Sequence, residues 1–161
     1  MSQVTLKKMV INNVVGNVLG HAGITYWVKH EIEAIPAGGV QGWVADFLTT
    51  GFMFPAILFV IMFFVFRSAN TKNNLVIEEL DESALLDKLP DNGWTACLWV
   101  GLAGMVTVAL PLAVFLSFSG LQPLSPLSVS LLKGSWAGVI AAISVYAAYY
   151  LITTRGLTSR T

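Results

Sequence analysis

The chain has 161 residues, of which 55% are apolar and 11% charged, and its formal net charge is zero. Soluble domains carry about 25% charged residues, so this chain has too few charges to cover a soluble domain of its length. The neutral balance gives no basis for nucleic-acid binding, and the single cysteine, Cys97, excludes an intrachain disulfide or a multi-cysteine metal site. We therefore expect an integral membrane protein with the lipid bilayer around it.

Four apolar segments are long enough to cross a bilayer, for which a helix needs about 20 mostly apolar residues. We expect spans at about 6–28, 43–66, 94–118 and 131–153. The first is the weakest because asparagines and His21 interrupt it, and these residues also argue against a cleaved signal peptide. The sequence thus predicts an all-α fold, an integral membrane four-helix bundle of two antiparallel hairpins that forms a single domain over residues 1–161.

Lysine and arginine side chains divide unevenly between the two sides of this topology. The side with both termini and the central loop holds seven of them, and the other side holds Lys29 and Lys133. Because basic loops remain in the cytoplasm, we expect cytoplasmic N and C termini. Aromatic residues near the span ends fit an interfacial belt; they are Trp27, Trp43, Trp94, Trp136, Tyr146, Tyr149 and Tyr150.

The first segment carries polar side chains at every fourth position, so that they share one face of a helix. They are Asn13, Asn17, His21 and Thr25, here called the polar series. In lipid a polar side chain without a partner is costly, so this face must point toward protein or water. We expect an interior or oligomer-contact helix.

Two Gly-x-x-x-Gly pairs predict close helix packing, because small residues let backbones approach. The first pair is Gly16 and Gly20 beside the polar series, and the second is Gly134 and Gly138 in the fourth segment. The chain has more glycine- and asparagine-rich surface than one bundle can easily bury. We therefore expect a homo-oligomer or a complex with another membrane protein.

Three interpretations of the polar series stay open. The amides and glycines can simply hold helices together. Alternatively, the series forms a polar path in which His21 relays protons or contacts a solute. In the third, His21 is a haem ligand, and the second imidazole would have to come from another subunit because His30 lies at the outer boundary.

A second polar anomaly is Asp46, which lies about one turn inside the second segment, near Thr49 and Thr50. Lys133 begins the fourth segment at a similar depth, so an Asp46–Lys133 ion pair is one hypothesis. The other is that Asp46 caps its helix while Lys133 extends to the interface. If His21 converges with these two residues, the three would line a vestibule open to the outside.

The loop at residues 68–93 contains apolar residues at near-helical spacing with acidic residues between them, which predicts one short amphipathic helix ended by Pro90. That helix is either a solvated linker or a docking surface. Pro55 and Pro111 lie inside spans, where proline often kinks a helix.

Catalytic and phosphate-binding motifs are absent, so we expect no enzyme activity, no cofactor and no metal site. The Asn-x3-Asn first segment, an outer-loop proline and the run Trp43-Val44-Ala45-Asp46-Phe47-Leu48-Thr49-Thr50 resemble a group of small, uncharacterised bacterial four-span membrane proteins. The resemblance covers most of the chain. It implies a bacterial inner membrane and Asp46 as a family feature, and it implies no activity.

Two functions follow as hypotheses. One is a small transporter or channel with a polar path along the first helix, made of Asn13, Asn17, His21, Thr25, Asp46, Thr49 and Lys133. The other is a non-transporting membrane subunit or scaffold, which assembles through the polar, glycine-rich first helix and the acidic cytoplasmic loop.

Overall fold

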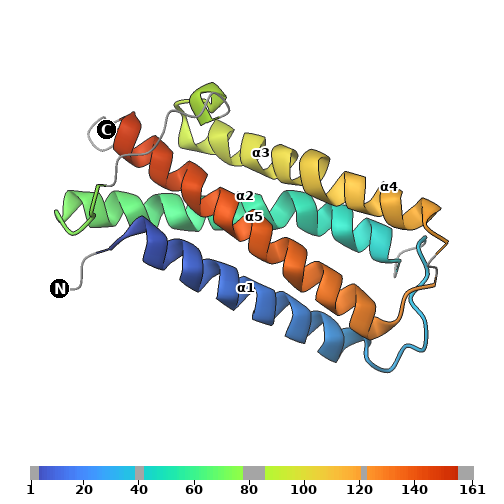
Figure 1. Cartoon of the computed structure of the whole chain (residues 1–161). Helices are drawn as coiled ribbons and strands as arrows, with labels where there is room; N and C mark the ends of the chain where they lie inside the picture. The colour runs from blue at the N-terminus through green and yellow to red at the C-terminus, as the bar shows by residue number, and fades with distance from the viewer. Residues whose placement is uncertain (1–3, 39–41, 78–85, 121–122, 156–161) are drawn as a thin grey trace.

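The computed structural model describes residues 4–38, 42–77, 86–120 and 123–155. Figure 1 shows the helical segments lying side by side and alternating in direction along the chain, apart from one consecutive pair, α3 and α4, that runs end to end. They are α1 (Leu6–Lys29), α2 (Trp43–Thr71), α3 (Gly93–Gly104), α4 (Leu110–Phe118) and α5 (Pro126–Thr154). A five-residue π-helical turn, Met105–Ala109, joins α3 to α4, so the two form one continuous rod.

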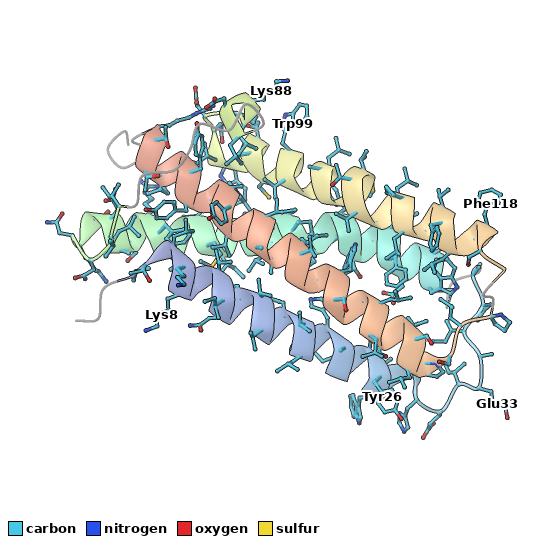
Figure 2. The ribbon with its side chains drawn as sticks, in the orientation of Figure 1. Lys8, Tyr26, Glu33, Lys88, Trp99 and Phe118 are labelled. Carbon is cyan, nitrogen blue, oxygen red and sulfur yellow. The ribbon has the colours of Figure 1, made fainter. Side chains whose placement is uncertain are left out.

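Three of these rods are long and apolar enough to cross a membrane: Trp43–Thr71, Gly93–Phe118 and Pro126–Thr154. Their outer faces carry large exposed apolar side chains such as Phe64, Trp99 and Phe115, and Figure 2 shows Trp99 projecting away from α3. Such a surface suits lipid. The chain is therefore all-helical in its described spans and is a multi-pass membrane protein.

The first predicted span differs from the other three. α1 is helical over Leu6–Lys29, which gives a length of about 36 Å, more than the hydrocarbon core of about 30 Å. It is nevertheless not among the helices apolar enough to cross, because asparagines and His21 lower its hydropathy. The crossing by α1 stays a prediction.

α5 lies at the centre of the arrangement, and its closest neighbours are α1 and α2 (Figure 1). The nearest helix pair is thus α1 with α5, rather than two helices adjacent in sequence as in the predicted hairpins. Glycine makes this contact possible. A Cβ added at Gly134 would lie 2.7 Å from the Val18 carbonyl oxygen, and one at Gly138 would lie 2.5 Å from Val18 Cγ2.

The predicted glycine pairs therefore behave differently. Gly134 and Gly138 are packed against α1, as expected, whereas Gly16, Gly20 and nearby Gly23 have open space beside them. Within this single chain a Cβ added at Gly16 or Gly20 meets no atom within 4 Å, so their packing against a helix of another subunit stays a prediction. The face that contacts α5 is instead made by larger residues, Val14, Val18 and Ala22, and the glycines lie on a different side of α1. We call Gly16, Gly20 and Gly23 the open glycine face.

α2 and the α3–α4 rod also approach closely. Gly101 and Gly104 of α3 lie against the backbone of α2, where a Cβ on either glycine would come within 3.0 Å of the carbonyl oxygen of Phe52 or Gly51. The π-helical turn follows at once and precedes Pro111. A proline ring clashes with the carbonyl four residues earlier, and a wider turn relieves that clash.

Short loop contacts hold each end of the molecule. At one end Ile35 and Leu124 form an antiparallel bridge between the two loops, with N–H···O distances of 2.9 and 3.3 Å. At the end with both termini, Val4 bridges to Leu75. Figure 2 places Lys8 and Lys88 at this terminal end and Glu33 at the other.

Several predicted interfacial aromatics are in fact buried. Trp43 and Trp136 pack with Phe47, at ring distances of 5.8 and 6.0 Å from it. Tyr149 and Tyr150 are buried too, and donate hydrogen bonds to the Val76 carbonyl and to Asp87. Large aromatics near a helix end serve either role, and hydropathy does not distinguish them. Trp27 and Trp94 remain highly exposed, as an interfacial belt requires.

The loop at residues 68–93 differs from its prediction where it is described. α2 continues to Thr71, residues 75–77 are not helical, and Leu86–Lys88 is a single 3-10 turn. Residues 78–85 of the expected amphipathic helix lie outside the described residues. Arg155 binds the end of this loop through the Asp91 carboxylate at 2.5 Å and the backbone carbonyl of Asp87.

The α1–α5 contact predicts unequal effects for two identical substitutions. Gly134→Ala places a methyl group against the α1 backbone and should lower the free energy of unfolding by about 1–3 kcal/mol. Gly20→Ala, the matched control, meets open space within the chain and, in detergent that keeps the protein monomeric, should leave stability unchanged or raise it by up to about 1 kcal/mol. Thermal unfolding in detergent micelles, followed by tryptophan fluorescence, measures both, and equal losses would contradict the contact.

Candidate functional site

The polar series contacts α2 at two of its four residues, Asn13 and His21. The Asn13 side-chain amide donates to the Met9 carbonyl at 2.9 Å and to Met62 Sδ of α2 at 3.6 Å. The Asn17 amide donates to the Asn13 carbonyl at 2.7 Å. Two of the four side chains thus satisfy their donors mainly on their own helix, which lowers the cost of removing these amides from water.

His21 and Thr25 continue the series toward the end of α1. The His21 ring meets Phe54 of α2 edge to face, with centroids 4.5 Å apart. Thr25, one turn further on, is buried with 6% of its surface exposed. Asn13 and His21 thus contact α2 through their side chains, and the series ends near the charged residues at the far end of α1.

An ion pair lies at that end. Lys133 Nζ of α5 is 2.6 Å from Asp46 Oδ1 of α2, and the Lys133 side chain is 11% exposed. The cap of α2 is Gly42, with no side-chain cap hydrogen bond. Of the two sequence hypotheses for Asp46, the structure contains the ion pair and not the helix cap.

A second lysine joins the pair, and sequence reasoning missed it. Lys29 Nζ, on the last residue of α1, lies 4.0 Å from Asp46 Oδ2, and its side chain is 14% exposed. Its position at a predicted span end indicated an ordinary interfacial lysine. The available signal was its spacing of four from Thr25, which continues the polar series by one more turn.

These residues line an open cavity of about 600 Å³ between the ends of α1, α2 and α5. Its described lining joins apolar side chains to five polar ones, namely Thr25, Lys29, Asp46, Thr49 and Lys133. The expected vestibule is present in part: Asp46 and Lys133 converge with Thr25 and Thr49, whereas His21 is not among the lining residues. Asn13 and Asn17 lie further along α1, so the predicted set divides into a cavity group and a half-buried group made of Asn13, Asn17 and His21.

The charged residues at the three helix ends compensate one another. An ammonium group in a low-dielectric site costs several kcal/mol unless a carboxylate compensates it. Asp46 supplies that compensation to Lys133 directly and to Lys29 at longer range. Thr50 adds a 3.4 Å hydrogen bond to the same carboxylate oxygen that Lys133 binds. One carboxylate thus links all three helices.

Comparisons with known proteins add no constraint: no protein-family model, curated protein or solved structure matches the chain. The site is therefore interpreted from its own geometry.

The ion pair predicts a stability loss that a second substitution partly reverses. Asp46→Asn leaves Lys133 without its carboxylate and should lower the free energy of unfolding by about 2 kcal/mol. Lys133→Met should cost a similar amount, and the double variant should cost less than the sum because neither charge remains. Lys8→Met, at the opposite end of the molecule, is the control. Strictly additive losses in detergent unfolding would contradict a direct pair.

Proposed function

We propose that the protein is a small transporter or channel that binds a polar solute in the outer cavity and passes it along the polar series of α1. The observation that carries the proposal is the Asp46–Lys133 pair, set in an open cavity where the polar series ends. Ionisable groups at membrane depth mark solute or ion pathways more often than they serve stability. No catalytic role is assigned to any residue.

The path itself would follow the boundary between α1 and α2. Thr25 lies in the cavity, His21 contacts α2 one turn below it, and Asn17 and Asn13 continue toward the other end. The polar series and the open glycine face are neighbouring sides of one helix. A second copy docked on the open glycine face would shield this boundary from lipid, so the proposed working unit is a homo-oligomer.

Topology and location belong to the same proposal. α1 crosses the membrane as a fourth span in a four-helix bundle, with α5 supplying most of its protein surface. Both termini lie in the cytoplasm of a bacterium and the cavity opens on the outer side of its inner membrane. The lysine and arginine distribution and the resemblance to small bacterial four-span proteins support this placement.

The second candidate is a non-transporting membrane subunit, and a specific observation favours it. The Asn13 and Asn17 amides bond to backbone carbonyls of α1 itself, as structural polar groups do. The open glycine face would then be a binding surface for another membrane protein. The two candidates differ in whether the polar series has to carry a solute.

Flux measurements in liposomes separate the two functions. We expect protein-dependent flux of at least one of three probes, namely chloride, protons or potassium, each followed by an enclosed dye. His21→Asn and Asp46→Asn should reduce it at least about tenfold while the oligomer persists in detergent. His30→Asn, whose ring is exposed at the helix end, should not. Absence of protein-dependent flux for all three probes, with assembly lost in the variants, would contradict transport and favour the subunit.

The proposed oligomer has its own test. Gly20→Ile places a bulky side chain on the open glycine face and should weaken self-association at least about tenfold in detergent. Leu19→Val, a change on a neighbouring exposed position, is the control. Analytical ultracentrifugation measures the dissociation constant, and an unchanged value for Gly20→Ile would rule out this face as the contact.

A further inference from the structure

The outer cavity has an imbalance of charge. In the described part of the chain, the ionisable side chains that line it are two lysines, Lys29 and Lys133, and one aspartate, Asp46. Residues 39–41 are Gly, Val and Gln in sequence and carry no charge. The formal charges of these three side chains therefore add up to a net charge of +1.

The neighbouring acidic residues do not correct the imbalance. The Glu31 side chain is 88% exposed and lies 3.9 Å from His30, outside the cavity lining. Glu33 is also exposed, and Figure 2 shows it at the tip of the loop, away from the helices. Neither carboxylate reaches Lys29 or Lys133 as Asp46 does.

The partial charges of the two helix ends at the cavity cancel and leave its net charge unchanged. The C-terminus of α1 at Lys29 brings a partial negative charge, and the N-terminus of α2 near Asp46 brings a partial positive charge of similar size. The remaining polar groups of the described lining, Thr25 and Thr49, have hydroxyls that can donate hydrogen bonds. The cavity thus offers ammonium and hydroxyl donors around a net positive charge.

Because the two lysines are largely buried, the net positive charge of the cavity can attract an anion. The Lys29 and Lys133 side chains are 14% and 11% exposed, so bulk water screens them poorly. A positive charge in such a place attracts a small anion, while the one carboxylate shared by both lysines limits how tightly that anion is held.

We propose that the cavity binds a singly charged anionic group between Lys29 and Lys133, with Asp46 as an internal competitor for both lysines. The group is either a free inorganic or carboxylate anion or the phosphate of a lipid headgroup, since the ammonium groups recognise the same chemistry in both. This inference rests on the proposed function and names the solute class of its cavity.

Binding is measured on the full chain in nanodiscs made only of phosphatidylcholine, with no transport step involved. Chloride, acetate and phosphate are titrated as sodium salts at low ionic strength, and the unfolding temperature is followed by tryptophan fluorescence. We expect a saturable rise for at least one anion, because a ligand of the folded state stabilises it. Exchange of sodium for choline should change nothing.

Substitutions of Asp46 and Lys29 test whether the cavity prefers an anion to a cation. Asp46→Asn removes the competitor and should tighten anion binding about tenfold, even though the protein itself is less stable. Lys29→Met should weaken binding about tenfold, and Lys29→Arg should restore it because the charge returns. Lys29 lies at a helix end and 4.0 Å from its partner, so these variants are informative even if Lys133→Met does not fold.

The opposite signs would overturn the inference. Weaker anion binding in Asp46→Asn, or a stabilisation by sodium that Asp46→Asn abolishes, would make the cavity a cation site. The absence of any saturable anion effect, in both phosphatidylcholine and phosphatidylglycerol nanodiscs, would also overturn it.

Lipid and free anion are separated by one further comparison. Stabilisation by phosphatidylglycerol that requires Lys29 and that soluble anions do not displace assigns the group to a lipid headgroup. Displacement by chloride, acetate or phosphate assigns it to a free anion. Anion binding without flux in liposomes would support the inference and contradict transport, whereas flux without anion binding would do the reverse.

Discussion

The close approach of α1 to α5 is the contact on which the rest of the structure depends. α1 is the least apolar of the long helices, and glycines at positions 134 and 138 let its valine face lie against the α5 backbone. Gly134 follows Lys133 in sequence, so the same contact brings the end of α1 beside that lysine. The position of Thr25 and Lys29 in the cavity is therefore a consequence of helix packing.

The charges at the helix ends then determine which solutes the cavity can bind. Asp46 is the carboxylate that α1, α2 and α5 share, and Lys29 and Lys133 approach it from two different helices. We expect that removing either the carboxylate or a lysine changes stability and ligand preference together. The groups that would bind a solute thus also join the helix ends that surround the open cavity. A solute of the right charge can compete with Asp46 for the lysines, which couples binding to the packing of three helices.

Much of the fold was predictable because hydropathy over 20 residues is a strong signal. The spans at 43–66, 94–118 and 131–153 each correspond to a long apolar helix, with ends shifted by a few residues. Hydropathy does not indicate which helices pack against each other, so the contact between α1 and α5 could not be predicted from it. It also cannot separate buried from interfacial aromatics, which is why Trp43, Trp136 and Tyr149 were expected at the interface.

The candidate site could be predicted only where two isolated charged residues lie at a similar depth in their apolar segments. Asp46 and Lys133 stood out because each is an isolated charge in an apolar segment, and depth alone brought them together. Lys29 was missed because a lysine at a span end is common, and only helix pairing turns it toward Asp46. His21 was placed in the cavity on depth alone, whereas it contacts Phe54 one turn below. Solid-state NMR in lipid bilayers, with ¹⁵N-labelled lysine and ¹³C-labelled aspartate, measures the Lys133–Asp46 contact directly. The structure predicts a measurable dipolar coupling between lysine ¹⁵Nζ and the aspartate carboxylate ¹³C, since Nζ of Lys133 lies 2.6 Å from Oδ1 of Asp46, and its loss in Asp46→Asn. A spectrum with no Asp46-dependent coupling would contradict the charged site.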